Sequence, residues 1–142
     1  MTADLARFLD AQREQYDTAL AEVRAGRKQS HWMWYVFPQI AGLGASEMSR
    51  RYAIRDREEA LAYLAHPVLG SRLVQVSEAL LAVQDRSIRE ILGTPDDLKL
   101  RSCSTLFASV SPPGSVFSQV LERFFDGRPD PATLERLEGP RD

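Results

Sequence analysis

The chain has little of three residue types that often carry chemistry: one cysteine, two histidines and two lysines among 142 residues. A single cysteine, Cys103, excludes an internal disulfide, which fits the reducing cytoplasm in which we expect the protein to reside. The cysteine and the two histidines are far apart in the sequence and have no recognised metal-ligand spacing. We therefore expect neither a metal nor a cofactor.

Long apolar runs and an excess of positive charge are also absent. No run approaches the roughly 20 apolar residues of a membrane-spanning helix, and residues 1–4 lack the basic and apolar regions that begin a signal peptide. The net charge is −2, and no helical segment has a basic reading face. We expect no membrane association and no binding to nucleic acid.

What is present is an ordinary globular composition, with 44% hydrophobic and 27% charged residues. A chain of this length folds as one domain and buries roughly 70% of its unfolded surface. Apolar residues recur at helical spacing in every block of the sequence. This pattern predicts an all-α fold, a compact single-domain bundle of about seven or eight helices over residues 1–142. Residues 138–142 are expected to form a frayed tail.

Periodicity and cap residues also predict where the helices lie. Two are expected to be long, near residues 4–25 and 67–84. Shorter helices are expected at 47–52, 56–65, 85–93, 94–109, 116–126 and 130–137. Ser46 and Thr94 are the predicted caps of two of these helices. Cys103 lies on an apolar helical stripe, which predicts a buried and unreactive thiol.

The stretch at residues 28–39 holds both tryptophans, one of the histidines and one of the lysines. Its central seven residues are large and mostly apolar, so most of them must be buried. We predict two helical turns capped by Ser30 and closed by the proline, with His31, Trp34 and Tyr35 on one face. The stretch can be a core helix rich in aromatic residues, or it can be the apolar wall of a binding site with polar flanks.

Residues of this stretch and of four later blocks form a set of specific motifs. They are Lys28-x-Ser30-His31-Trp32-Met33-Trp34-x-Val36-Phe37-Pro38-Gln39, Gly42-Leu43-Gly44, Tyr52-Ala53-Ile54, Ala62-Tyr63-Leu64-x-His66-Pro67-x-Leu69-Gly70-x-Arg72-Leu73 and Asp97-x-Lys99-Leu100-x-Ser102-x-x-Thr105-Leu106-Phe107. Together they resemble the signature of a bacterial family, the domain of unknown function 1810, across nearly the whole chain. The resemblance implies a small, all-helical, single-domain protein and no established reaction. A "calpastatin-like" label used for the family fits poorly, because calpastatin is disordered whereas this chain is patterned to fold.

The candidate site residues combine cations, aromatic rings and amides. His31 and Lys28 are the predicted catalytic residues. A histidine can act as a general acid or base, and a buried lysine can act as a base because burial shifts its pKa. The predicted ligand-binding residues are Ser30, Trp32, Trp34, Gln39, Arg50, His66, Asp97 and Lys99. Cations beside aromatic walls suit a planar anionic ligand, such as a nucleotide or an ADP-ribose-like compound.

Three of these residues have structural interpretations as well. Arg50 can belong to a solvated, salt-bridged helix face. His66 precedes a proline and can be a hydrogen-bonded joint between two helices. Lys99 can pair with a surface acid and never meet Lys28, whereas the functional hypothesis places Lys28, His31 and Lys99 in one site.

The sequence supports two hypotheses about function. In the first, the protein binds or acts on a small anionic, nucleotide-like or phosphorylated ligand at an aromatic and basic cleft. In the second, the aromatic motif is a surface that binds another protein. A concave pocket over His31 and Trp34 would favour the first, and a flat exposed aromatic patch would favour the second.

Overall fold

Helices dominate the computed structural model, which describes residues 5–138. They are α1 (Ala6–Arg24), α2 (Met33–Val36), α3 (Glu47–Arg51), α4 (Arg57–Ala65), α5 (Leu69–Ala82), α6 (Ile88–Leu92), α7 (Asp96–Ser109), α8 (Val116–Phe125) and α9 (Pro131–Glu138). The described part contains no strand, only a parallel bridge between Ile40 and Ile54. The prediction of an all-α single domain is therefore confirmed, with nine helices within residues 5–138 instead of about seven or eight.

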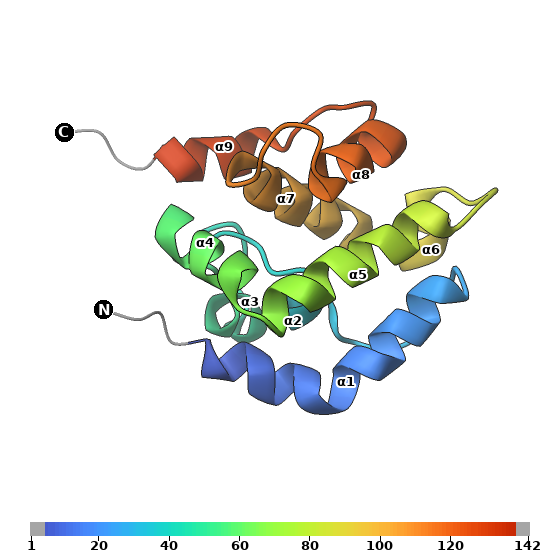
Figure 1. Ribbon diagram of the computed structural model, residues 1–142, viewed down its shortest axis with the longest axis horizontal. Helices are drawn as coiled ribbons and strands as arrows, with labels where there is room; N and C mark the ends of the chain where they lie inside the picture. The colour runs from blue at the N-terminus through green and yellow to red at the C-terminus, as the bar shows by residue number, and fades with distance from the viewer. Residues whose placement is uncertain (1–4, 139–142) are drawn as a thin grey trace.

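Helices far apart in the sequence pack against one another, with α1, α5 and α7 making most of the contacts (Figure 1). Helix α1 contacts α2 and α5, α5 also contacts α4 and α8, and α7 lies against α8 and α9. Helix α1 thus lies on one side of the molecule and the α7–α9 group on the other, with α5 crossing between them. The predicted tail at 138–142 lies, apart from Glu138, outside the described residues.

Helix α7 supplies much of the core. Cys103 is buried and only 1% exposed, as predicted, and burial raises the pKa of its thiol well above the usual value. On the same helix Phe107 contacts the rings of Tyr63 and Phe117, with centroids 5.4 and 5.8 Å away. The buried Tyr63 hydroxyl accepts a hydrogen bond of 2.9 Å from the Gln12 amide, so its burial leaves no polar atom unsatisfied.

Arginines tie the helices together through backbone carbonyls. Helix ends leave carbonyl oxygens without intrahelical donors, and a guanidinium can bind two such oxygens at once. The arginines that donate to carbonyls of other elements are Arg7 to Arg51 and Ala53, Arg57 to Ser109, Arg101 to Arg128 and Pro129, Arg123 to Leu81 and Val83, and Arg136 to Gly42. Five of the sixteen arginines thus join one element to another.

The two predicted helix caps have different outcomes. Ser46 caps α3, since its side chain accepts a hydrogen bond from the backbone N–H of Ser49. The prediction for Thr94 is wrong, because α7 begins at Asp96 and no side chain at the preceding position caps it. The first N–H groups of α7 bind backbone carbonyls instead, since Leu98 and Lys99 both donate to Pro95. The Leu98 N–H also donates to the Asp97 carboxylate at 2.9 Å.

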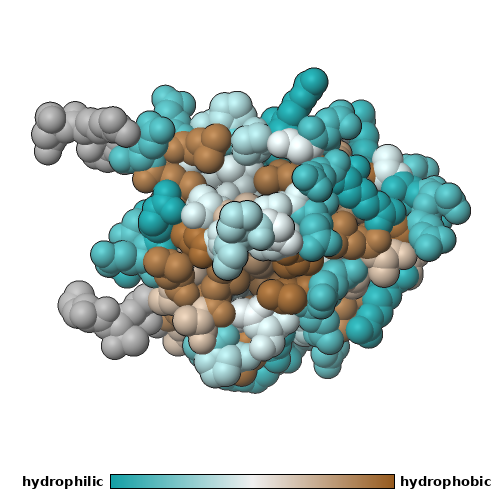
Figure 2. Space-filling model, turned by 45° about the horizontal axis from the view of Figure 1, so that its top comes forward, coloured by the Kyte–Doolittle hydropathy of each residue, from teal (hydrophilic) through white to brown (hydrophobic). Residues whose placement is uncertain are grey.

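Hydrophobic atoms also reach the surface. Figure 2 shows brown atoms through the middle of one face and teal atoms around its rim. The large apolar side chains that are exposed are Leu61, Val68, Leu98 and Leu134. None of the helices within residues 5–138 combines the length and the apolar character needed to cross a membrane.

Candidate functional site

The aromatic stretch is less helical than its composition predicts. Helix α2 has only four residues, so the prediction of two turns is wrong. Ser30 does not cap it, because the Ser30 hydroxyl donates to the Glu22 carboxylate at 2.6 Å. The segment before α2 is therefore held by the end of α1 and not by its own helical hydrogen bonds.

Glu22 is the residue that organises this segment. Its carboxylate accepts hydrogen bonds from the backbone N–H groups of Gln29 and Ser30 at 2.8 and 2.9 Å. It also accepts from the indole N–H of Trp32 at 2.9 Å. Partial burial by itself would raise the pKa of Glu22, but the hydrogen bonds from Ser30, Gln29 and Trp32 outweigh it and lower the pKa to about 2.

Sequence reasoning missed Glu22 altogether. On a helical wheel it lies beside the charged face of α1, where a carboxylate usually interacts with solvent. The signal that could have found it is the short loop to the motif, since a carboxylate just before a turn rich in N–H donors tends to bind them. With this anchor, Trp32 is fully buried (0% exposed).

The two lysines of the chain meet at one carboxylate. The Lys28 ammonium lies 2.9 Å from one oxygen of Asp96, and the Lys99 ammonium lies 3.7 Å from the other. Each lysine also lies over a tryptophan ring, Lys28 at 5.1 Å from Trp32 and Lys99 at 5.2 Å from Trp34. The acid between the lysines is Asp96, whereas the sequence singled out its neighbour Asp97.

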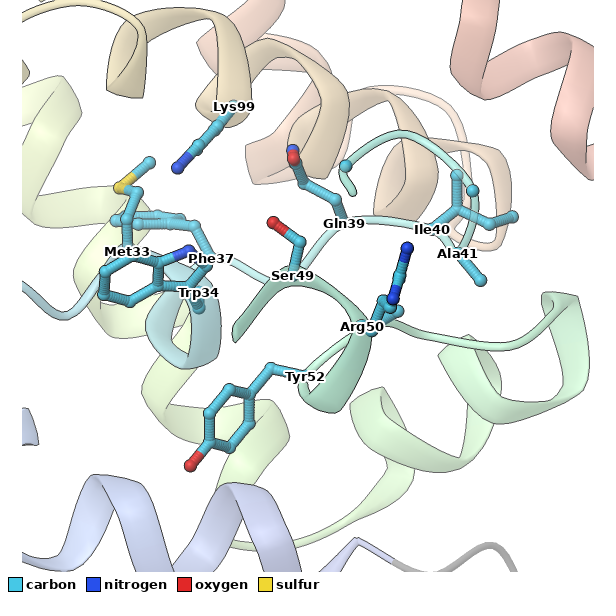
Figure 3. Close-up of a pocket in the computed structure, with 13 residues that line it drawn as sticks. Met33, Trp34, Phe37, Gln39, Ile40, Ala41, Ser49, Arg50, Tyr52 and Lys99 are labelled. Carbon is cyan, nitrogen blue, oxygen red and sulfur yellow. The ribbon is translucent and has the colours of Figure 1, made fainter. Parts of the chain in front are cut away.

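A pocket of about 150 Å³ opens beside these groups, between α2, the loop that follows it, α3 and the start of α7 (Figure 3). Its apolar wall includes Met33, Trp34 and Phe37. Its polar edge consists of Gln39, Ser49, Arg50 and Lys99. In Figure 3, Lys99 extends toward Trp34 at one side of the pocket while Arg50 lies at the opposite side.

Several donors around the pocket are unused within the protein. The indole N–H of Trp34, the side-chain amide of Gln39 and the guanidinium of Arg50 have no hydrogen-bond partner within residues 5–138. Within residues 5–138, the one acidic partner of Lys99 is Asp96, at 3.7 Å. These side chains are therefore available to a ligand without breaking existing hydrogen bonds.

The glycine loop lets the backbone approach the pocket closely. A Cβ atom on Gly44 would lie 2.5 Å from the Ser49 hydroxyl oxygen, closer than atoms can pack. Gly42 has a φ of +97°, a conformation that side chains rarely adopt, and a Cβ there would lie 2.6 Å from the Arg136 guanidinium carbon. Both glycines line the pocket, so a side chain at either position would displace the side chain of Ser49 or Arg136 beside it.

Four of the predicted site residues are brought together at this pocket: Trp34, Gln39, Arg50 and Lys99. Lys28 does not line the pocket, but it contacts Asp96, which also contacts Lys99. Neither of the predicted catalytic residues lines the pocket, and the side chain of His31 is exposed.

The remaining predicted site residues have structural contacts. Ser30 and Trp32 bind Glu22. The His66 ring nitrogen Nδ1 accepts hydrogen bonds from the backbone N–H groups of Val68 and Leu69 at 3.1 and 3.2 Å, which makes His66 the joint between α4 and α5. In the part of the chain that the structure describes, no three His, Cys, Asp or Glu side chains are placed to hold a metal ion.

The comparisons with known proteins agree with this fold. Residues 2–137 match the family described as "Protein of unknown function (DUF1810)". The chain is similar to the conserved hypothetical protein Rv1873 from Mycobacterium tuberculosis, whose crystal structure has 47% sequence identity and a TM-score of 0.94. That similarity covers 96% of this chain and 98% of the other. No curated protein matches the chain.

Proposed function

Since the chain belongs to the family of unknown function DUF1810, we propose from its pocket that it binds a small ligand with a planar ring and an anionic group. The observation that carries this proposal is the set of unused donors on Trp34, Gln39 and Arg50, with Lys99, around one hollow. The ring lies against Trp34, and the anionic group is bound from the side of Arg50.

The charges around the pocket support an anion. Its lining contains Arg50 and Lys99 and no acidic residue among those described. The nearby carboxylate of Asp96 is shared between Lys28 and Lys99, so this cluster keeps one positive charge. Two cations that flank a partly enclosed hollow repel each other, and an anion bound there removes that repulsion.

The size of the pocket supports a ring. An apolar cavity of about 150 Å³ is large enough for benzene, and the pocket has about this volume. A single planar group therefore fits against Trp34, with the polar part of the ligand extending toward the open side. The described lining offers hydrogen-bond donors and cations around an apolar wall, which supports binding of such a ligand.

Tryptophan fluorescence and thermal shift test this proposal, with AMP, ribose 5-phosphate and inorganic phosphate as probes. A ligand that binds only the native state raises its stability by RT ln(1 + [L]/Kd). We expect AMP to raise the melting temperature and to quench Trp34, and expect Arg50→Ala and Lys99→Met each to weaken binding by about tenfold. Arg89→Ala, an exposed arginine away from the pocket, is the matched control.

Binding of none of these probes, or equal weakening by the Arg89→Ala control, would refute the proposal. The competing hypothesis of a protein-binding aromatic surface has less support, because Trp32, Met33 and Phe37 are each at most 2% exposed. Little aromatic surface of the motif is left for a flat interface.

A further inference from the structure

A second basic hollow adjoins the pocket. It has a volume of about 370 Å³ and is lined by Arg7, Arg50, Arg51, Arg55 and Glu59, with Ala41 and Ala53. Arg50, Ala41 and Ala53 also line the first pocket. The two hollows therefore meet at Arg50, and a ligand that leaves the pocket on this side passes directly into a second cationic environment.

The positive charges of this hollow are only partly neutralised. Glu59 is buried, 2% exposed, and pairs with Arg7 at 3.0 Å and with Arg55 at 3.4 Å. Arg51 lies over the Tyr52 ring at 5.5 Å, and neither it nor Arg50 has an acidic side chain within ion-pair distance in the described part of the chain. Among the described residues that line this hollow, one carboxylate thus lies beside four guanidinium groups.

One cation of this hollow, Arg7, is fixed by several hydrogen bonds. The Arg7 guanidinium donates to the carbonyl oxygens of Arg51 and Ala53, each at 2.8 Å, in addition to its ion pair with Glu59. Arg7 is therefore held in place by hydrogen bonds, while the side chains of Arg51 and Arg55 are exposed to solvent. A buried-side cation with two exposed cations beside it favours an anion that bridges them.

From this arrangement we infer that the ligand carries two linked anionic groups after its ring, as a nucleoside diphosphate does. The ring lies at Trp34, the first phosphate lies at Arg50, and the second lies in the hollow at Arg51 and Arg55. Figure 3 shows Arg50 at the side of the pocket away from Trp34, which is the order that this assignment needs. The inference rests on the proposed function and adds the class of ligand to it.

Isothermal titration of AMP and ADP against the full chain at 0.15 M salt tests the inference. The wild type is expected to bind ADP about tenfold more tightly than AMP, because only the second phosphate reaches the second hollow. The double variant Arg51→Ala/Arg55→Ala should lose this preference while it keeps its affinity for AMP. Arg13→Ala/Arg89→Ala removes the same charge from exposed positions that line neither hollow, and should keep the preference.

The possible outcomes separate the two proposals. Equal affinities for AMP and ADP, or a preference that survives in the Arg51→Ala/Arg55→Ala variant, would overturn the inference and leave the proposed function in place. Binding of neither nucleotide overturns both. Circular dichroism shows whether loss of the Arg55–Glu59 pair destabilises the double variant. If it does, the single variant Arg51→Ala tests the inference. This variant should bind ADP about threefold more weakly and should bind AMP as the wild type does.

Discussion

The two tryptophans are separated by one residue and have opposite surroundings. Trp32 is 0% exposed and donates its indole N–H to Glu22 at 2.9 Å. Trp34 is partly exposed, its indole N–H has no partner within residues 5–138, and it lines the pocket. The two tryptophans therefore have different surroundings, because the turn that holds them lies at the boundary between the core and a cavity.

The lysines repeat this division. Lys28, with 8% of its side chain exposed, lies over Trp32 and forms the closer contact with Asp96. Lys99, with 26% exposed, lies over Trp34 and has the longer contact. We call Glu22, Lys28 and Trp32 the anchoring group, and Trp34, Gln39, Arg50 and Lys99 the pocket group. The comparison suggests that the anchoring group stabilises the fold and the pocket group binds ligand.

The largest expected effect is the loss of the Trp32 ring. Trp32→Ala should lower the free energy of unfolding by about 3–5 kcal/mol, because it leaves a cavity in a packed core. Trp34→Ala should cost less than about 1 kcal/mol, since its ring faces a cavity that already exists. Urea denaturation measures both values. Similar losses for the two variants would contradict the division.

The second prediction concerns pH and the Glu22 carboxylate. Its pKa is about 2 in the folded protein against an ordinary 4.5, so the stabilisation is complete above pH 4.5 and is lost as the pH falls toward 2. Glu22→Gln should lower stability at pH 7 by about 1.5–3 kcal/mol, as expected for hydrogen bonds to a charged group.

The measurement is the difference in urea midpoint between wild type and Glu22→Gln from pH 7 to pH 2. The difference should shrink as the pH falls below 4.5, because the wild-type carboxylate then loses its advantage. Glu14→Gln, an exposed residue on the same helix, is the control and should change stability by less than about 0.5 kcal/mol. A constant difference across the range would show that the charge of Glu22 is not what stabilises the segment.

The third prediction separates the lysines. Lys28→Met should cost about 1–2 kcal/mol in stability, since Asp96 loses its closer partner in a mostly buried contact. Lys99→Met should cost less than about 0.5 kcal/mol and should instead weaken the binding of AMP. Denaturation and titration on the same two variants test the contrast, and it fails if the two measurements rank the variants in the same order.

The smallest expected effect belongs to His31. The side chain is exposed and does not line the pocket, although the sequence predicts it as a catalytic residue. His31→Ala should change stability by less than about 0.5 kcal/mol and should leave AMP affinity unchanged. A clear loss of AMP binding in calorimetry would contradict this prediction and would assign His31 to the pocket group.

Local patterns predicted most of the fold. The spacing of apolar residues located α1 and α5 to within a few residues, and the apolar stripe through Cys103 predicted its burial. The failures are at α2 and at the start of α7. At both places the hydrogen bonds differ from the expected pattern, because the Glu22 carboxylate binds Ser30, and the Pro95 carbonyl binds the first turn of α7.

The sequence by itself determined the all-α class, the approximate helices and the residue types of the site, because periodicity and composition are properties of neighbouring residues. Only the tertiary structure decided which tryptophan is buried, which acid joins the lysines and which cations face the pocket. These depend on how the start of α7 docks against the segment before α2, where Asp96 lies between Lys28 and Lys99. A contact between residues about 70 positions apart depends on the packing of the whole chain, and no local pattern contains it.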